Sequence, residues 1–183
     1  KGGDAADTTR VDGTYTNSIV NGNKGGDLIS TTSASNTTSI YGGAGHDTIE
    51  LGTGSFAANV YGGAGNDSIT LLSGANVNTI AGGGLSDTIS ILENAFSAGT
   101  LIYGDGFGTT SAGTGTGGSA DGGDYIGGTA ANLLAGATVY GAGGADTIYL
   151  AISGITAGRD IVDGGNGADS INLSLDAAEA DLT

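Results

Sequence analysis

The chain has 183 residues, 39 of them glycine, and a formal net charge of −15 with only four lysines and arginines. The missing basic patch disfavours nucleic acid and anionic membrane surfaces as partners, and the lack of cysteine excludes disulfides and thiolate metal sites. No apolar run approaches the roughly 18 residues of a membrane-spanning helix, so we expect no membrane insertion.

A repeat of about 20 residues runs along the chain from its N-terminus. Residues 40–49 return as residues 60–69 and, with fewer matches, as residues 80–89. Each copy has a Gly-rich turn, an aspartate and a short alternating segment such as 47–51, which is typical of a strand. A second, variable turn and a second short strand complete the unit. Two strands and two turns in each repeat unit predict one coil of an all-β, parallel β-solenoid.

The inward positions of these strands predict two aliphatic ladders, which a single coil could not bury but a stack can. The first ladder consists of Ile29, Ile49, Ile69, Ile89, Ile126, Ile148 and Ile171. The second consists of Val20, Ile40, Val60, Ile80, Ile102, Val139 and Val162. Four tyrosines share one outward position and are expected to stack along the outside as packing, with a ligand-binding aromatic strip as the less favoured alternative: Tyr41, Tyr61, Tyr103 and Tyr140.

The repeat also divides the chain into three parts. We expect solenoid coils over residues 1–106, a Gly/Ser/Thr-rich loop insertion over residues 107–121, and further coils of the same domain over residues 122–183. The composition of the insertion is typical of a flexible surface loop.

One aspartate closes each Gly-rich turn, and the first five recur at the spacing of the repeat without a break. The eight aspartates are Asp7, Asp27, Asp47, Asp67, Asp87, Asp124, Asp146 and Asp169. Stacking would place neighbouring carboxylates about 5 Å apart, where their repulsion costs about 1 kcal/mol in water and several times more in a partly dry turn. No lysine or arginine recurs beside them, so the pattern predicts bound cations. Calcium fits best because it accepts carboxylates and backbone carbonyls, whereas zinc prefers histidine or cysteine and His46 is the only histidine.

The pattern Gly-Gly-x-Gly-x-Asp-x-aliphatic-x in residues 42–50, 62–70 and 164–172 resembles the RTX (repeats-in-toxin) family of calcium-binding repeats. The resemblance implies a right-handed parallel β-roll with calcium ions between the turns of successive coils. Among the implied ligands, Asp7 and Asp124 match less well because their glycines are incomplete. The implied ligands are the carboxylates of Asp7, Asp27, Asp47, Asp67, Asp87, Asp124, Asp146 and Asp169 and the carbonyls of Gly43, Gly45, Gly63, Gly65, Gly165 and Gly167. RTX rolls carry two motifs in each coil, but this chain has one motif in each repeat unit, so calcium is expected along one edge only.

No catalytic constellation is visible in the sequence. His46 occupies a variable turn position, no base accompanies the many hydroxyl side chains at a nucleophile-like spacing, and no Gly-rich turn ends in Gly-Lys-Ser/Thr like a phosphate loop. We therefore expect a protein that is not an enzyme.

The leading hypothesis is a secreted or cell-surface structural protein, such as a component of a surface layer, sheath or filament, that folds on calcium and self-associates head to tail or laterally. The alternative is a calcium-binding RTX module of a larger secreted toxin, protease or adhesin. Ice binding ranks low, because the outward turn positions read Ala64 and Asn66 or Gly84 and Ser86 instead of a regular Thr/Asn array.

Overall fold

The computed structural model of the chain describes residues 2–32, 37–52, 54–72, 75–92, 99–106, 121–128, 137–152 and 161–175. Within these ranges the regular structure is all-β, in two parallel sheets. The eight-stranded sheet contains β1 (Thr8–Val11), β3 (Leu28–Thr31), β5 (Thr48–Leu51), β7 (Ser68–Leu71), β9 (Thr88–Ile91), β11 (Tyr125–Gly127), β13 (Thr147–Ile152) and β15 (Ser170–Leu175). The seven-stranded sheet contains β2 (Thr16–Lys24), β4 (Thr37–Ala44), β6 (Gly54–Ala64), β8 (Ala75–Gly84), β10 (Leu101–Asp105), β12 (Thr138–Gly143) and β14 (Ile161–Asn166).

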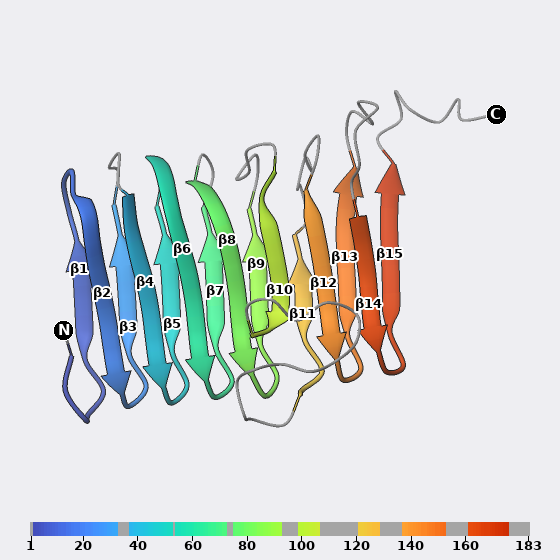
Figure 1. The fold of residues 1–183 in the computed structure, drawn as a ribbon, viewed down its shortest axis with the longest axis horizontal. Coiled ribbons are helices and arrows are strands. Elements are labelled where there is room, and N and C mark those ends of the chain that lie inside the picture. The colour runs from blue at the N-terminus through green and yellow to red at the C-terminus, as the bar shows by residue number, and fades with distance from the viewer. Residues whose placement is uncertain are drawn as a thin grey trace.

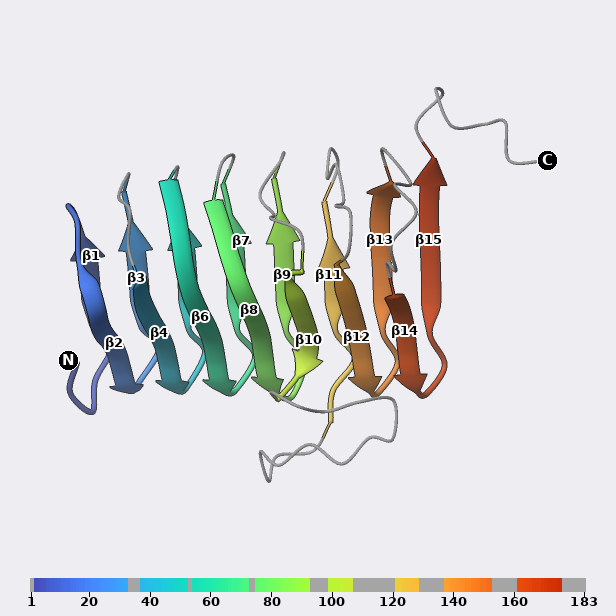
Figure 2. The same ribbon diagram turned by 45° about the horizontal axis from the view of Figure 1, so that its top comes forward.

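Successive strands alternate between the two sheets, so each coil contributes one strand to each layer (Figure 1). In Figure 1 the even-numbered strands lie nearer the viewer and point down, the odd-numbered strands point up behind them, and the chain advances to the right, which is a right-handed coil. Figure 2 shows the two layers facing each other from β1 to β15. The predicted parallel β-solenoid is therefore confirmed, and residues that pair in adjacent coils, such as Ile49 and Ile69, have the sequence spacing of the repeat.

The two predicted aliphatic ladders form the core. Ile49 pairs in register with Ile69, and Val60 with Ile80, and all four side chains are fully buried. The first ladder ends at Ile171, which is 44% exposed because β15 is the last described strand of its sheet. A third row, which includes Leu51, Leu71 and Leu150, joins the same core. Burial of one such side chain stabilises the fold by about 1.5–3 kcal/mol, so the stack depends on these rows.

The outward tyrosines stack in two pairs rather than in one continuous column. The rings of Tyr41 and Tyr61 lie 5.0 Å apart, and those of Tyr103 and Tyr140 lie 5.5 Å apart. Ala81 takes the register position between Tyr61 and Tyr103. The column is therefore interrupted where the repeat places an alanine.

The solenoid continues on both sides of the sequence insertion. Strand β10 pairs with β8 and β12, and β11 pairs with β9 and β13. Asp121 forms a parallel bridge with Leu85, so the chain is back in the stack one residue earlier than the sequence pattern suggested. Residues 107–120 of the predicted loop lie outside the described residues.

Candidate metal centre

Outside the connection from β10 to β11, the Gly-rich turns connect each even-numbered strand to the next odd-numbered strand and form the lower edge of the solenoid in Figure 1. In the turn from β4 to β5, Gly43 and Gly45 have φ angles of 120° and 136°, a conformation that disfavours any side chain. This backbone path brings the Asp47 side chain back into the coil, where the residue is only 1% exposed.

The eight motif aspartates, called the aspartate ladder below, are joined by one repeated hydrogen bond. In each step the backbone N–H of one aspartate donates to Oδ1 of the aspartate in the next coil. The distance is 2.7 Å from Asp27 N to Asp47 Oδ1 and 2.8 Å from Asp47 N to Asp67 Oδ1. The same bond crosses the insertion, from Asp87 N to Asp124 Oδ1 at 2.7 Å. The remaining steps join Asp7 to Asp27, Asp67 to Asp87, Asp124 to Asp146 and Asp146 to Asp169.

The second carboxylate oxygen, Oδ2, has no hydrogen-bond partner in the interior of the ladder, although it is buried. These orphaned oxygens belong to Asp27, Asp47, Asp67, Asp87, Asp124 and Asp146. Their residues are all between 1% and 3% exposed. A buried polar atom without a partner is costly and rare in native proteins, and here the same orphan recurs once per coil.

A glycine lies directly beside each orphaned oxygen and leaves space for it. A Cβ atom on Gly42 would lie 2.6 Å from Asp47 Oδ2 and 2.5 Å from the carbonyl oxygen of Gly62 in the next coil. The same two neighbours, an Oδ2 and a next-coil carbonyl, surround the corresponding point at Gly22, Gly62, Gly82, Gly104 and Gly141. The first glycine of each motif thus brings one carboxylate oxygen and one carbonyl oxygen to the same place.

Burial makes the ionised form of these carboxylates unfavourable. It raises the pKa of Asp67 to about 6, of Asp87 to about 8 and of Asp124 to about 9, and the neighbouring aspartates raise these pKa values further. The pKa values of Asp47 and Asp146 are also raised, chiefly by burial. The N–H that each Oδ1 accepts lowers the pKa but does not offset burial. Between Asp47 and Asp146, protonation or a bound cation would therefore stabilise the buried carboxyls.

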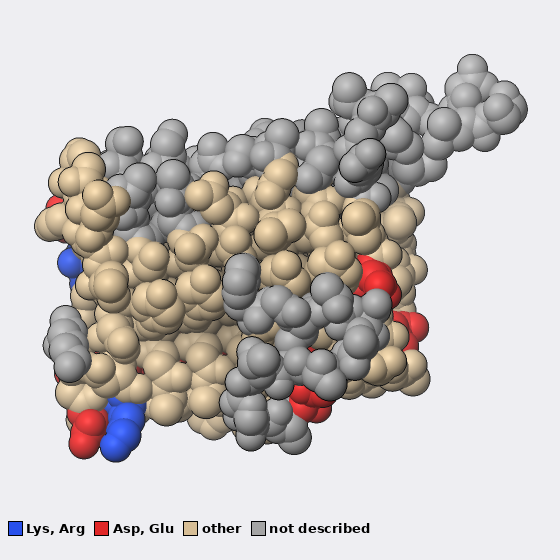
Figure 3. Space-filling model, in the orientation of Figure 1, with Lys and Arg blue, Asp and Glu red and all other residues tan. Residues whose placement is uncertain are grey.

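No lysine or arginine pairs with a ladder carboxylate among the described residues, and the nearby His46 lowers the pKa values of Asp47 and Asp67 without offsetting burial. The ion pair that the described residues contain joins Arg10 and Asp12, which are both exposed. Only a few acidic side chains are visible on the described part of the face formed by the even-numbered strands (Figure 3). Six of the ladder aspartates, from Asp27 to Asp146, are buried in the turns.

The donor set fits a hard, oxygen-seeking cation such as calcium. An ion at one step would be held by an Asp Oδ2 and by backbone carbonyls, because no group of three His, Cys, Asp or Glu side chains comes together in the described ranges. The oxygen donors at each step suit zinc poorly, because zinc prefers histidine and cysteine ligands. Calcium in proteins commonly combines carboxylate, carbonyl and water oxygens, and these turns offer the first two.

The structure distinguishes between the glycines that the motif treats alike. The carbonyls beside the orphaned oxygens belong to the first glycine of each motif, namely Gly42, Gly62, Gly82, Gly104, Gly141 and Gly164. The expected carbonyl ligands lie further along the turn, where the carbonyls of Gly43, Gly45 and Gly63 point towards the Cα atoms of Gly63, Gly65 and Gly83. The other expected carbonyl ligands belong to the same part of the turn: Gly65 is the equivalent of Gly45 in the next coil, and Gly65, Gly165 and Gly167 all have positive φ. The motif has glycine at both kinds of position. Only the structure shows which glycines leave space beside Oδ2 and which adopt the positive φ of the turn.

The two ends of the ladder differ from its interior. Asp7 and Asp169 are partly exposed. Asp7 Oδ2 accepts the backbone N–H of Gly3 at 2.6 Å, so it is not orphaned. A cation at either end would be more exposed to water than one in the interior.

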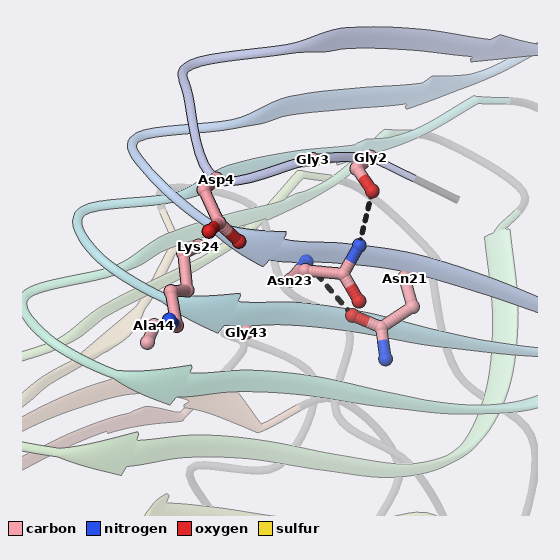
Figure 4. A pocket seen from close by; sticks show the side chains of 8 residues that line it. All are labelled: Gly2, Gly3, Asp4, Asn21, Asn23, Lys24, Gly43 and Ala44. Atoms are coloured by element: carbon pink, nitrogen blue, oxygen red, sulfur yellow. Dashed lines mark hydrogen bonds between the residues drawn. The ribbon is translucent and has the colours of Figure 1, made fainter.

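A separate shallow pocket of about 520 Å³ lies at the N-terminal end of the stack (Figure 4). It is lined in part by Asp4, Asn23, Lys24 and Gly43. Asn23 donates from its side chain to the Gly2 carbonyl, and Asn21 Oδ1 accepts the backbone N–H of Asn23 at 2.8 Å. These polar groups satisfy one another, so the pocket presents no obvious ligand.

No protein-family model, curated protein or solved structure matches the chain. None of the described residues forms a helix that is long and apolar enough to span a membrane.

Proposed function

We propose that the chain is a calcium-binding structural repeat protein of the RTX type, secreted or held at a cell surface, whose coils fold and stack on calcium. The observation that carries this proposal is the row of buried Oδ2 atoms without partners, repeated once per coil and always beside a carbonyl of the next coil. The raised pKa values of Asp67, Asp87 and Asp124 support it, because ionised carboxyls in this place need a positive counterpart.

The residues divide the task between them. Each Asp Oδ1 fixes the side chain by accepting an N–H from the preceding coil, and each Oδ2 is left available for an ion. The first glycine of the motif keeps the space open, and the next-coil glycine supplies a carbonyl oxygen. Bound calcium would supply the positive charge that offsets carboxylate burial and would connect adjacent coils.

The proposal places folding where calcium is abundant, which is outside the cell. Without calcium, repulsion between ionised carboxylates opposes stacking, and an acidic chain of this composition is expected to stay disordered. With calcium, binding free energy becomes folding free energy. This coupling suits a component of a surface layer, sheath or filament that assembles only after export.

Calcium titration followed by far-UV circular dichroism tests the proposal. We expect a metal-depleted chain at pH 7.5 to lack strand signal and to gain it on addition of calcium, whereas an equal concentration of magnesium gives little gain because magnesium retains its waters. A full strand signal at pH 7.5 in a chelator, unchanged by calcium, would refute it.

Self-association is part of the same proposal. The last described strands, β14 and β15, leave Ile161, Ile171 and Leu173 exposed by 43–45%, and exposed solenoid ends tend to stack. Light scattering with and without a chelator tests this element. Monodisperse monomers at saturating calcium would contradict it while leaving the calcium site intact.

A further inference from the structure

The coil that contains the sequence insertion carries a second acidic feature outside the aspartate ladder. Strand β10 ends at Asp105, and the described chain resumes at Asp121, on the far side of residues 107–120. Asp105 pairs in register with Gly83, at a position where the regular coils have Gly43 and Gly63. The regular turn therefore forms without an acidic residue at this place.

The repeat does not require a buried carboxylate at the position of Asp105. It is 2% exposed, and its Oδ1 has no hydrogen-bond partner. Its Oδ2 accepts the backbone N–H of Gly143 at 2.9 Å. A buried carboxylate oxygen that no donor satisfies calls for a cation or a proton.

Asp105 and Asp121 both lie against Gly143. Gly143, which donates to Asp105, is also flanked by the Asp121 carboxylate, because a Cβ on Gly143 would lie 2.7 Å from Asp121 Oδ2. Burial raises the pKa of Asp105 to about 6, and among the charged groups that raise it further Asp121 has the largest effect. The nearby backbone N–H of Gly122 lowers this pKa by the smallest amount, but the geometry leaves Oδ1 without a hydrogen bond.

The backbone of Leu85 lies next to the segment that contains Asp121. The carbonyl of Leu85 lies against the Cα of Gly122, and Leu85 bridges to Asp121. Leu85 has a φ of 73°, a strained value for a leucine, at the place where the regular coils have Gly45 and Gly65. The turn is therefore irregular beside Asp121.

We propose that Asp105 and Asp121 form a separate site for one calcium-sized divalent cation at the root of the insertion, with Asp105 Oδ1 and the Asp121 carboxylate as its charged ligands. Two carboxylates with carbonyls and water suffice for calcium, which is compatible with the absence of any three-carboxylate cluster among the described residues. Neither residue belongs to the repeating motif, but the site lies beside the ladder, because the Asp105 charge raises the pKa values of Asp87 and Asp124.

Counting bound calcium by equilibrium dialysis and atomic emission tests the site in the full-length chain. The variants are Asp105→Asn and Asp121→Asn, and Glu50→Gln is the control because Glu50 is an exposed acidic residue on the outside of β5. We expect each aspartate variant to bind one calcium ion fewer per chain than the unmodified protein at saturation, and the control to bind the same number.

Equal calcium counts in both aspartate variants and the unmodified chain would overturn the proposal. Asp121 is exposed, so Asp121→Asn keeps the test decisive if Asp105→Asn fails to show the strand signal. The ladder variant Asp67→Asn separates this proposal from the previous one. If only the ladder binds calcium, Asp67→Asn lowers the count and Asp121→Asn does not; if only the new site binds calcium, the reverse holds.

Discussion

The substitution Asp67→Asn separates the two roles of a ladder carboxylate. Asparagine keeps an Oδ1 that can accept the N–H of Asp47, which Asp67 Oδ1 accepts at 2.8 Å. It replaces the orphaned Oδ2 with an NH₂ group, which can donate to a carbonyl, and a Cβ on Gly62 would touch both this Oδ2 and the carbonyl of Gly82. The variant therefore removes a buried charge and a metal ligand while keeping the size of the side chain.

The pKa of Asp67 gives the expected magnitude. Burial raises it from 3.8 to about 6. At about 1.36 kcal/mol for each pKa unit, the ionised carboxyl costs the metal-free folded state up to about 3 kcal/mol at pH values above 6. Asp67→Asn is expected to recover up to this amount without calcium. Since the variant has no charge for the ion to offset, its apparent calcium affinity should fall by about 100-fold.

Urea unfolding followed by far-UV circular dichroism measures both effects. At pH 6.5 Asp87 and Asp124, with pKa values of about 8 and 9, are protonated, which favours a folded metal-free chain. We expect Asp67→Asn to unfold at higher urea than the unmodified protein in calcium-free buffer and at lower urea in saturating calcium. Glu50→Gln, which removes an exposed charge from β5, should change neither midpoint by much.

A variant that is less stable than the unmodified protein in calcium-free buffer would refute the reasoning, because Asp67 would then stabilise the fold without an ion. An unchanged calcium midpoint would also refute it, because Oδ2 would then not be a ligand.

Three further predictions concern the ladder and the core. Burial raises the pKa values of Asp67, Asp87 and Asp124 above their unfolded values. The stability of the metal-free fold should therefore be full below about pH 4 and be lost as the pH rises through about 6 to 9. Thermal midpoints that stay flat over that range without calcium would contradict this. Gly62→Ala should destabilise the calcium-bound fold by about 1–3 kcal/mol, since the new Cβ meets Asp67 Oδ2 at 2.5 Å. The control Gly3→Ala should be tolerated, because the nearest neighbour of its new Cβ lies at 3.8 Å. Equal urea midpoints for the two variants would show that the space beside Oδ2 is not needed. Ile69→Ala should cost about 2–5 kcal/mol and Ile171→Ala, in the same row but 44% exposed, much less; similar costs in urea unfolding would argue against the ladder as the core.

The sequence was sufficient to predict the architecture because the signals were repeated. One short period-2 strand is weak, but Ile49, Ile69 and Ile89 at a constant spacing leave one register for stacking, and the structure has that register. The same spacing predicts that the aspartates stack in register, because the residue two positions before each of these isoleucines is a ladder aspartate.

The direction of the aspartate side chains could not be predicted from spacing. It depends on the turn conformation set by residues such as Gly43 and Gly45, and it decides that Oδ1 is used in the ladder while Oδ2 is left without a partner. The role of Gly42 was also hidden, because a glycine needed for space and a glycine needed for positive φ have the same letter. Asp105 was missed because it lies where the other coils have glycine, such as Gly43 and Gly63, so the repeat gives an acidic residue no role at this position.

Crystallographic analysis of the protein grown in calcium at neutral pH tests the central claim most directly. The account predicts one strong peak per coil in the interior of the ladder, about 2.3–2.6 Å from Asp47 Oδ2 and from its equivalents. A map in which each Oδ2 instead lies at hydrogen-bond distance from the neighbouring glycine carbonyl, with no peak between them, would mean that the carboxyls are protonated and would contradict the account.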